Sequence, residues 1–151
     1  MNTSKHTFAL HTRFEGAIIR DHHILLIKER INATGRSFWM LPGGGIEPSE
    51  TDEDCVKREM KEETNLDVKV KRLLSIEPAP PNRPYPQIRT YLCVPLNNDA
   101  KPGFGEGSTI EIIEVKWFDL RSEADWDPLL VNDPFTYDQL QRVRKELGYL
   151  S

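Results

Sequence analysis

A chain of 151 residues is long enough to bury one shared core and too short for two ordinary domains, so we expect a single domain over residues 1–151. Its 38% hydrophobic and 29% charged residues are typical of a soluble globular protein, and its 9% aromatic residues argue against a disordered chain. No aliphatic run approaches the roughly 20 residues of a membrane helix, and residues 1–14 hold no apolar block. We therefore expect no membrane partner and no secretory signal, and we predict a cytoplasmic location. Cys55 and Cys93 form no CxxC pair, and we interpret both as core thiols.

The net charge of −4 is unevenly distributed along the chain. Residues 44–66 carry eight acidic and three basic side chains, a balance of −5, so the remaining residues sum to +1. A segment with this charge repels a nucleic-acid backbone and attracts cations. We therefore expect no stable nucleic-acid partner.

Short β-rich runs in the first third of the chain predict strands. Residues 13–20 and 23–27 flank the polar dipeptide Asp21-His22, which is typical of a hairpin. Residues 31–37 are turn-rich, and residues 38–41 then predict another short strand. The order of these runs favours a β-sheet at the start of the domain.

A glycine-rich bend and a helix follow. Residues 43–45 are three consecutive glycines, which let the backbone turn sharply and approach a ligand closely. Ser49 is the predicted N-cap of a helix that runs to about Thr64, and acidic residues fill its first turns. Asn65 is the predicted end of this helix, because Asn tolerates the left-handed conformation.

The second half of the chain predicts more strands and a terminal helix. Residues 67–76 and 88–96 are strands in this prediction, and residues 109–118 form a third. Asp133 can cap a helix whose apolar residues share one face and which Gly148 ends. Alternating strands and helices of this kind indicate an α/β fold.

Three glutamates of the first predicted helix, Glu59, Glu62 and Glu63, are offset by three and four residues and so share one face. Their repulsion costs an isolated helix roughly 0.2–0.5 kcal/mol per pair, which favours a compensating cation. Mg²⁺ prefers oxygen ligands and is commonly held by one or two carboxylates together with phosphates. The alternative is an ordinary solvated face that neighbouring basic residues neutralise, and the glutamates alone favour that alternative.

The spacing of the whole segment favours the cation site over the solvated face. Gly44 is followed after five residues by Glu50, and after seven more by residues 58–66, with the sequence REMKEETNL. This arrangement resembles the Nudix box of the MutT-like Nudix hydrolases, and six fixed identities coincide by chance at roughly 10⁻⁸ per starting position. Asn65 stands where the box usually has Gly, and we expect Asn to keep the left-handed helix end. Residues 39–45 and 115–118 are similar to flanking strands of the family.

The resemblance implies an α/β/α sandwich with a mixed β-sheet and a loop-helix-loop catalytic motif. It implies hydrolysis of a phosphoanhydride bond in a nucleoside diphosphate linked to another group, such as a nucleoside triphosphate, a nucleotide sugar or ADP-ribose. Mg²⁺ or Mn²⁺ is the implied cofactor, with Glu59, Glu62, Glu63 and the carbonyl of Gly44 as ligands and Arg58 as the residue that orients them. A small-molecule nucleotide is the implied partner, and a homodimer is kept open.

The general base is not fixed by the resemblance. Glu59 is one candidate, and Glu111 is another because family members often add an acid from outside the box. Glu106 and Glu114 compete with Glu111, and a strand glutamate often only faces solvent. Glu50 matches an earlier glutamate of the box, and we assign it to helix entry or to support of the ligands.

Four residues are candidates for substrate binding. Trp39 and Tyr85 can stack on a base, and Arg83 and Arg89 can contact phosphate or ribose. Each has a plainer reading, since Trp39 can belong to the core and Arg83 can keep a proline-rich loop soluble. Two other functions stay open for the chain as a whole: a nucleotide-sensing module without catalysis, and an interaction domain with an acidic helix.

Overall fold

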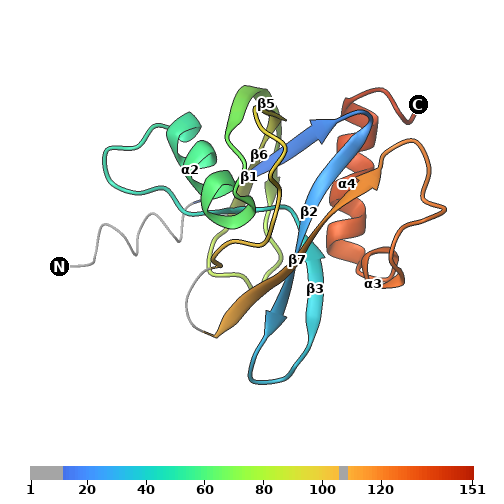
Figure 1. Ribbon diagram of the computed structural model, residues 1–151, viewed down its shortest axis with the longest axis horizontal. Helices are drawn as coiled ribbons and strands as arrows, with labels where there is room; N and C mark the ends of the chain where they lie inside the picture. Colours follow the sequence, from blue (N-terminus) through green and yellow to red (C-terminus); the bar gives the residue numbers. More distant parts are fainter. Residues whose placement is uncertain (1–11, 106–108) are drawn as a thin grey trace.

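A mixed β-sheet lies between helices in the computed structural model of the protein, which describes residues 12–105 and 109–151 (Figure 1). The elements in chain order are β1 (Arg13–Arg20), β2 (His23–Ile31), β3 (Ser37–Met40), β4 (Gly43–Gly44), α2 (Asp52–Thr64), β5 (Val68–Pro78), β6 (Gln87–Pro95), β7 (Ile110–Asp119), α3 (Pro128–Val131) and α4 (Pro134–Glu146). No helix among the described residues is long and apolar enough to span a membrane.

The strand pairing makes the sheet mixed. β1 runs parallel to β6, with residues 13–18 beside residues 88–93, and the other strand pairs are antiparallel. β1 pairs with β2 only near their connecting turn, and the two strands diverge beyond it. At the start of β1, β4 takes the place of β2 as the pairing partner. β7 follows β2 along its length, and β5 pairs with β6. The predicted mixed sheet is therefore confirmed.

Side chains of the central strands alternate between two cores, because successive residues of a strand point to opposite faces. One core joins β1 and β2 to α2 and contains Phe14, Ile18, Leu25, Cys55, Val56, Met60, Leu66, Val68 and Cys93. The other lies against α3 and α4 and contains Ala17, Ile24, Leu26, Trp39, Leu41, Leu74, Phe118, Leu120, Trp126, Leu130, Leu140 and Val143. α2 and α4 thus cover opposite faces of the sheet, as expected for the sandwich (Figure 1). Both cysteines are buried free thiols, as predicted.

The start of α2 differs from the prediction. Thr51 is the N-cap: its hydroxyl accepts a hydrogen bond from the backbone N of Asp54 at 3.1 Å, and its own backbone N faces the Asp54 carboxylate at 3.5 Å. Ser49 has a φ of 72°, whereas an N-cap residue is usually extended, so the prediction of Ser49 was wrong. Glu50 therefore precedes the helix instead of lying in its first turn.

Other helix ends agree with the prediction. Asn65 ends α2 in the left-handed conformation with a φ of 65°, and its backbone N donates to the carbonyl of Lys61 at 3.0 Å. Asp133 caps α4, and Gly148 follows the helix with a φ of 89°. The short helix α3 was not predicted, and several strands are longer than their sequence patterns indicated.

Candidate active site

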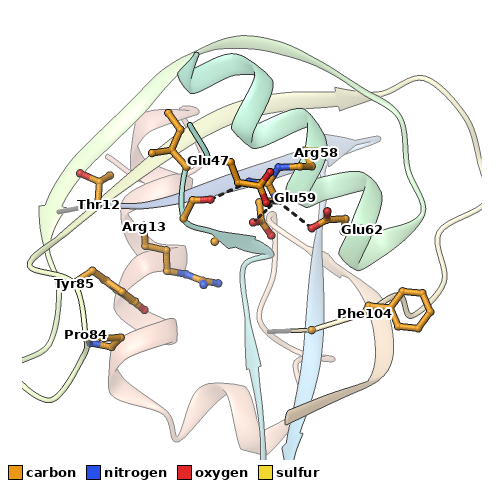
Figure 2. Close-up of a pocket in the computed structure, with 13 residues that line it drawn as sticks. Thr12, Arg13, Glu47, Arg58, Glu59, Glu62, Pro84, Tyr85 and Phe104 are labelled. Atoms are coloured by element: carbon orange, nitrogen blue, oxygen red, sulfur yellow. Dashed lines mark hydrogen bonds and ion pairs between the residues drawn. The ribbon is translucent and has the colours of Figure 1, made fainter. Parts of the chain in front are cut away.

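A cleft of about 390 Å³ opens beside α2, the glycine bend and the start of β1 (Figure 2). It is lined by Thr12, Arg13, Gly44, Gly45, Ile46, Glu47, Arg58, Glu59, Glu62, Pro84, Tyr85, Phe104 and Gly105. The volume falls within the roughly 300–1,000 Å³ of small-molecule sites. Figure 2 shows an acidic side around Arg58 and an opposite side that carries Arg13 and Tyr85.

Arg58 is surrounded by carboxylates on the acidic side. Its Nη1 lies 2.9 Å from Glu59 Oε2, 3.1 Å from Glu62 Oε1 and 3.7 Å from Glu47 Oε2. Glu59 is buried, whereas the side chains of Glu47 and Glu62 are about half exposed. Three carboxylates therefore gather around one positively charged nitrogen at the cleft wall, and oxygen donors of this kind suit a hard divalent cation.

The other edge of the Arg58 guanidinium is fixed from behind. Its Nε and Nη2 donate to the two oxygens of Glu50 at 2.6 and 3.0 Å, and Nη2 also donates to the carbonyl of Gly45 at 2.9 Å. Hydrogen bonding to Glu50 raises the pKa of Arg58 despite partial burial, and Glu59 adds to this effect. Arg58 thus has a fixed position and charge, and Glu50 supports it instead of capping the helix.

Replacing Glu50 by Gln is expected to lower the free energy of unfolding by about 1–3 kcal/mol near neutral pH, since a charge-assisted bidentate pair is lost. Hydrogen bonds from Arg58 and, against the effect of burial, from the Glu47 backbone N hold the pKa of Glu50 below its ordinary 4.5. A lowered folded-state pKa contributes stability above the unfolded value, and that stability disappears as pH falls through the folded pKa.

The difference between wild type and Glu50→Gln should therefore shrink as pH falls from about 5 to about 3. Urea unfolding at a series of pH values measures it. The control is Glu53→Gln, because Glu53 lies exposed on the same helix in a pair with Lys57. A difference that stays constant over this pH range would contradict the assigned role of Glu50.

Glu63 is separated from Glu59 and Glu62, the other two predicted metal ligands of the helix. Its side chain is buried and its Oε1 accepts a hydrogen bond from the backbone N of Gly43 at 2.8 Å, behind the glycine bend. Burial raises the pKa of Glu63, although Arg13 opposes this. The structure brings Glu59, Glu62 and Gly44 to the cleft, and Glu63 does not line it. Within residues 12–105 and 109–151, no three acidic, His or Cys side chains form a complete metal-ligand set.

The last turn of α2 is held by the segment that carries Phe104. Three backbone N–H groups donate to carbonyls of this turn: Lys101 to Thr64 at 3.0 Å, Gly103 to Glu63 at 3.0 Å, and Phe104 to Glu62 at 2.9 Å. These bonds satisfy carbonyls that a helix end otherwise leaves without partners. The backbone of the glutamate face is therefore fixed by a distant loop, and Phe104, 86% exposed, stands at the cleft.

The four predicted substrate residues fall in different places. Tyr85 lines the cleft. Arg89 pairs with Asp52 at 3.3 Å, and the guanidinium of Arg83 lies 5.8 Å from the ring centre of Phe135; neither lines the cleft.

Trp39 requires a correction. Its ring is 1% exposed, packs edge to face against Phe118 with centres 5.0 Å apart, and its Nε1 donates to Asp127 at 2.9 Å. A ring enclosed in this way cannot stack on a base, so Trp39 belongs to the core.

Glu111 also lies away from the cleft. Its side chain is 55% exposed, its Oε1 is 2.7 Å from Nη2 of Arg30 on the paired strand β2, and it is absent from the cleft lining. Glu114 is exposed on the same strand, and Glu106 lies outside the described residues. Among the candidates for the base that lie within residues 12–105 and 109–151, the structure brings only Glu59 to the cleft.

Two charged residues of the cleft lining, Arg13 and Glu47, were not predicted as site residues. Arg13 was treated only as the start of a strand, and Glu47 only as part of the acidic segment. A charged residue at the start of a largely apolar strand is a weak local signal for Arg13. Its approach to Tyr85 depends on the pairing of β1 with β6, which no local pattern encodes.

The fold agrees with the comparisons with known proteins. Residues 10–138 match the family model of the NUDIX domain, and the chain belongs to this family, whose members typically depend on divalent metals. The crystal structure of a NUDIX hydrolase from Nitrosomonas europaea is similar, with a TM-score of 0.70 and 25% identity over 93% of this chain and 73% of that chain.

Two relatives match parts of the sequence. The ADP-ribose pyrophosphatase of Methanocaldococcus jannaschii is 47% identical over 70 residues, which are 46% of this chain and 41% of that protein. The NAD-capped RNA hydrolase NudC of Vibrio atlanticus is 32% identical over 113 residues, which are 75% of this chain and 39% of that protein. The matched part of the chain thus spans about two-fifths of the length of these relatives.

Proposed function

We propose that the protein is a divalent-metal-dependent hydrolase that cleaves a phosphoanhydride bond in a nucleoside diphosphate linked to another group. The observation that carries this proposal is the set of three carboxylates, from Glu47, Glu59 and Glu62, around Nη1 of Arg58 at the wall of a cleft of ligand size. Family membership supports it, because the same segment carries the box.

Mg²⁺ or Mn²⁺ is the proposed cofactor. Glu59, Glu62 and the carbonyl of Gly44 would hold it, and Glu63 would support the glycine bend from behind or join the ligands after a side-chain rotation. Arg58 already shows that a positive charge is stabilised among these carboxylates. When bound, the ion supplies charge that neutralises phosphate oxygens and lowers the pKa of the attacking water.

Glu59 is the proposed general base. A water oxygen attacks one phosphorus of the diphosphate, its proton passes to the Glu59 carboxylate, and the bridging P–O bond breaks with its electron pair on the leaving phosphate. Arg58, 2.9 Å from Glu59 Oε2, holds this carboxylate in place while Glu50 holds Arg58. No covalent enzyme intermediate is required.

The names of the two relatives support the substrate class. ADP-ribose and the NAD cap both contain an adenosine diphosphate joined to a second group, which is the class proposed here. ADP-ribose is the first compound to test, because the relative with 47% identity is named for it.

A hydrolysis screen tests the proposal with ADP-ribose, nucleotide sugars, nucleoside triphosphates and dinucleoside polyphosphates, each with Mg²⁺, Mn²⁺ or EDTA. We expect release of a nucleoside monophosphate or pyrophosphate only with a divalent ion. Glu62→Gln should lower activity at limiting metal at least about 10–100-fold, since even an outer partner of a metal ligand contributes that much.

Glu53→Gln is the matched control, because Glu53 is an exposed glutamate of the same helix. Equal activity in EDTA would refute the metal dependence. Nucleotide binding without turnover of any compound would instead favour the nucleotide-sensing module.

A further inference from the structure

We infer that Arg13 and Tyr85 form a phosphate-binding subsite on the side of the cleft opposite the acidic cluster. The two phosphates of the substrate would then be shared between the two sides, one with the carboxylates and their cation, the other with Arg13. This inference rests on the proposed function, and it adds a residue that determines substrate affinity.

Arg13 offers hydrogen-bond donors to the cleft. Its Nε donates to Glu15 Oε2 at 2.8 Å and its Nη2 to the carbonyl of Leu41 at 3.1 Å. No hydrogen bond of Nη1 is formed with any residue in the described part of the chain, and Figure 2 shows the guanidinium pointing into the cleft. One edge of the group is therefore anchored, and donors remain for a ligand.

The position of Arg13 is fixed by a buried network that reaches α4. Glu15 is 1% exposed, and its Oε1 accepts a hydrogen bond from Nε2 of Gln139 at 2.9 Å. The same Nε2 donates to Oε1 of Glu77 at 3.0 Å, and Glu77 in turn contacts Arg142. A buried, doubly supported carboxylate leaves Arg13 little freedom, which is what pre-organised phosphate recognition needs.

The charge of Arg13 persists in this setting. Burial lowers its pKa, but the nearby Glu15, Tyr85 and Glu63 outweigh burial and hold the pKa above its ordinary value. The plain alternative is that Arg13 and Glu15 form only a structural ion pair. That alternative accounts for the bond from Nε to Glu15, but it does not account for the part of the guanidinium that faces the cleft.

Tyr85 completes the subsite. The guanidinium of Arg13 lies 6.0 Å from its ring centre, close enough for a cation–π contact. Burial raises the pKa of Tyr85 although Arg13 opposes this, so its hydroxyl stays neutral and can donate a hydrogen bond. The glutamates on the opposite side repel any phosphate that is not matched by a cation, which directs a second phosphate toward Arg13.

The double variant Arg13→Gln, Glu15→Gln tests the subsite, because it removes both charges and leaves neither buried ion unpaired. The matched control is Arg72→Gln, Glu146→Gln, an exposed pair outside the cleft. Calorimetry measures binding of α,β-methylene-ADP, whose bridging carbon prevents hydrolysis at that bond, and of adenosine, with Mg²⁺ present. Circular dichroism and thermal unfolding check that each variant is folded.

The wild type should bind α,β-methylene-ADP more tightly than adenosine, and the double variant should lose about 10–100-fold in Kd for the methylene compound alone. Arg13→Lys, which keeps the charge without the planar fork, should lose less, and the control pair should lose nothing. The subsite is refuted if the double variant binds as the wild type does, if adenosine binding falls by the same factor, or if the wild type does not distinguish the two compounds.

Hydrolysis by the same variants separates this inference from the proposed function. The double variant should raise KM with little change in kcat. If no compound is hydrolysed but the loss of binding is seen, the proposed function fails and the subsite stands. If hydrolysis occurs with an unchanged KM in the double variant, the subsite fails and the proposed function stands.

Discussion

Glu59→Gln is expected to lower kcat by about 10²–10⁴ while the protein remains folded, since loss of a general base removes roughly that factor. Glu59 is buried at the cleft wall and accepts a hydrogen bond from Arg58 at 2.9 Å. A Gln side chain has the same shape and can still accept this bond, but it cannot take a proton from water. Kinetics with the best substrate of the screen, at saturating Mg²⁺ or Mn²⁺, measure the effect.

Saturating metal distinguishes loss of the base from loss of affinity for the ion. Glu62→Gln should recover most of its activity at high metal concentration, whereas Glu59→Gln should recover only the part lost through weaker metal binding and should keep the loss of kcat that follows from the missing base. Glu53→Gln again provides the control for removing a charge from α2. Retention of more than a tenth of the wild-type kcat by Glu59→Gln would show that another group takes the proton.

Gly103→Ala is expected to lower the free energy of unfolding by about 2–4 kcal/mol, which combines a steric clash with the loss of backbone hydrogen bonds. A Cβ at this position would lie 1.8 Å from the carbonyl oxygen of Glu62, and backbone atoms cannot rotate away as a side chain can. The segment from Lys101 to Phe104 would have to leave the last turn of α2. Urea unfolding measures the change.

Gly105→Ala is the matched control. A Cβ there meets its nearest atoms at 3.5 Å, an ordinary van der Waals contact, so we expect a change of less than about 1 kcal/mol. Equal stability of the two variants would mean that the loop can separate from α2 without cost, and the attachment described here would be wrong.

The sequence encodes the parts of the site that are local. Arg58 and Glu62 are one helical turn apart, so helix geometry alone brings them together, and they lie 3.1 Å apart in the structure. The left-handed end at Asn65 follows from the conformational range of Asn itself. The glycine bend and the order of the longer strands and helices were likewise predictable from short patterns, whereas the short helix α3 was not.

The start of α2 is a feature that local sequence patterns do not determine. Ser49 and Thr51 each precede an Asp by three residues, so both fit a capping pattern. Thr51 is the N-cap in the structure, and Glu50 thereby stays outside the helix, where both of its oxygens reach Arg58. The contact between Glu50 and Arg58 joins residues eight positions apart, and the helix-capping preferences of single residues do not predict it.

Burial of strand residues depends on partners that sequence patterns do not identify. Trp39 is enclosed because Phe118 of β7 and Asp127, the N-cap of α3, lie against it. Glu111 has an ion-pair partner because β7 pairs with β2 in a register that places it opposite Arg30. The alternation of apolar and polar residues along a strand predicts which face of the sheet a side chain lies on, but it does not predict which element covers that face.

The parallel pairing of β1 with β6 also sets the order in which the chain can fold. Residues 13–18 leave the ribosome long before residues 88–93, and contacts this distant in sequence carry a large loop-closure entropy. Until β6 exists, β1 has only its short pairings with β2 and β4. Arg13 and Tyr85 can therefore meet only after more than half of the chain has been synthesised, so a nascent chain that ends before β6 lacks one side of the cleft.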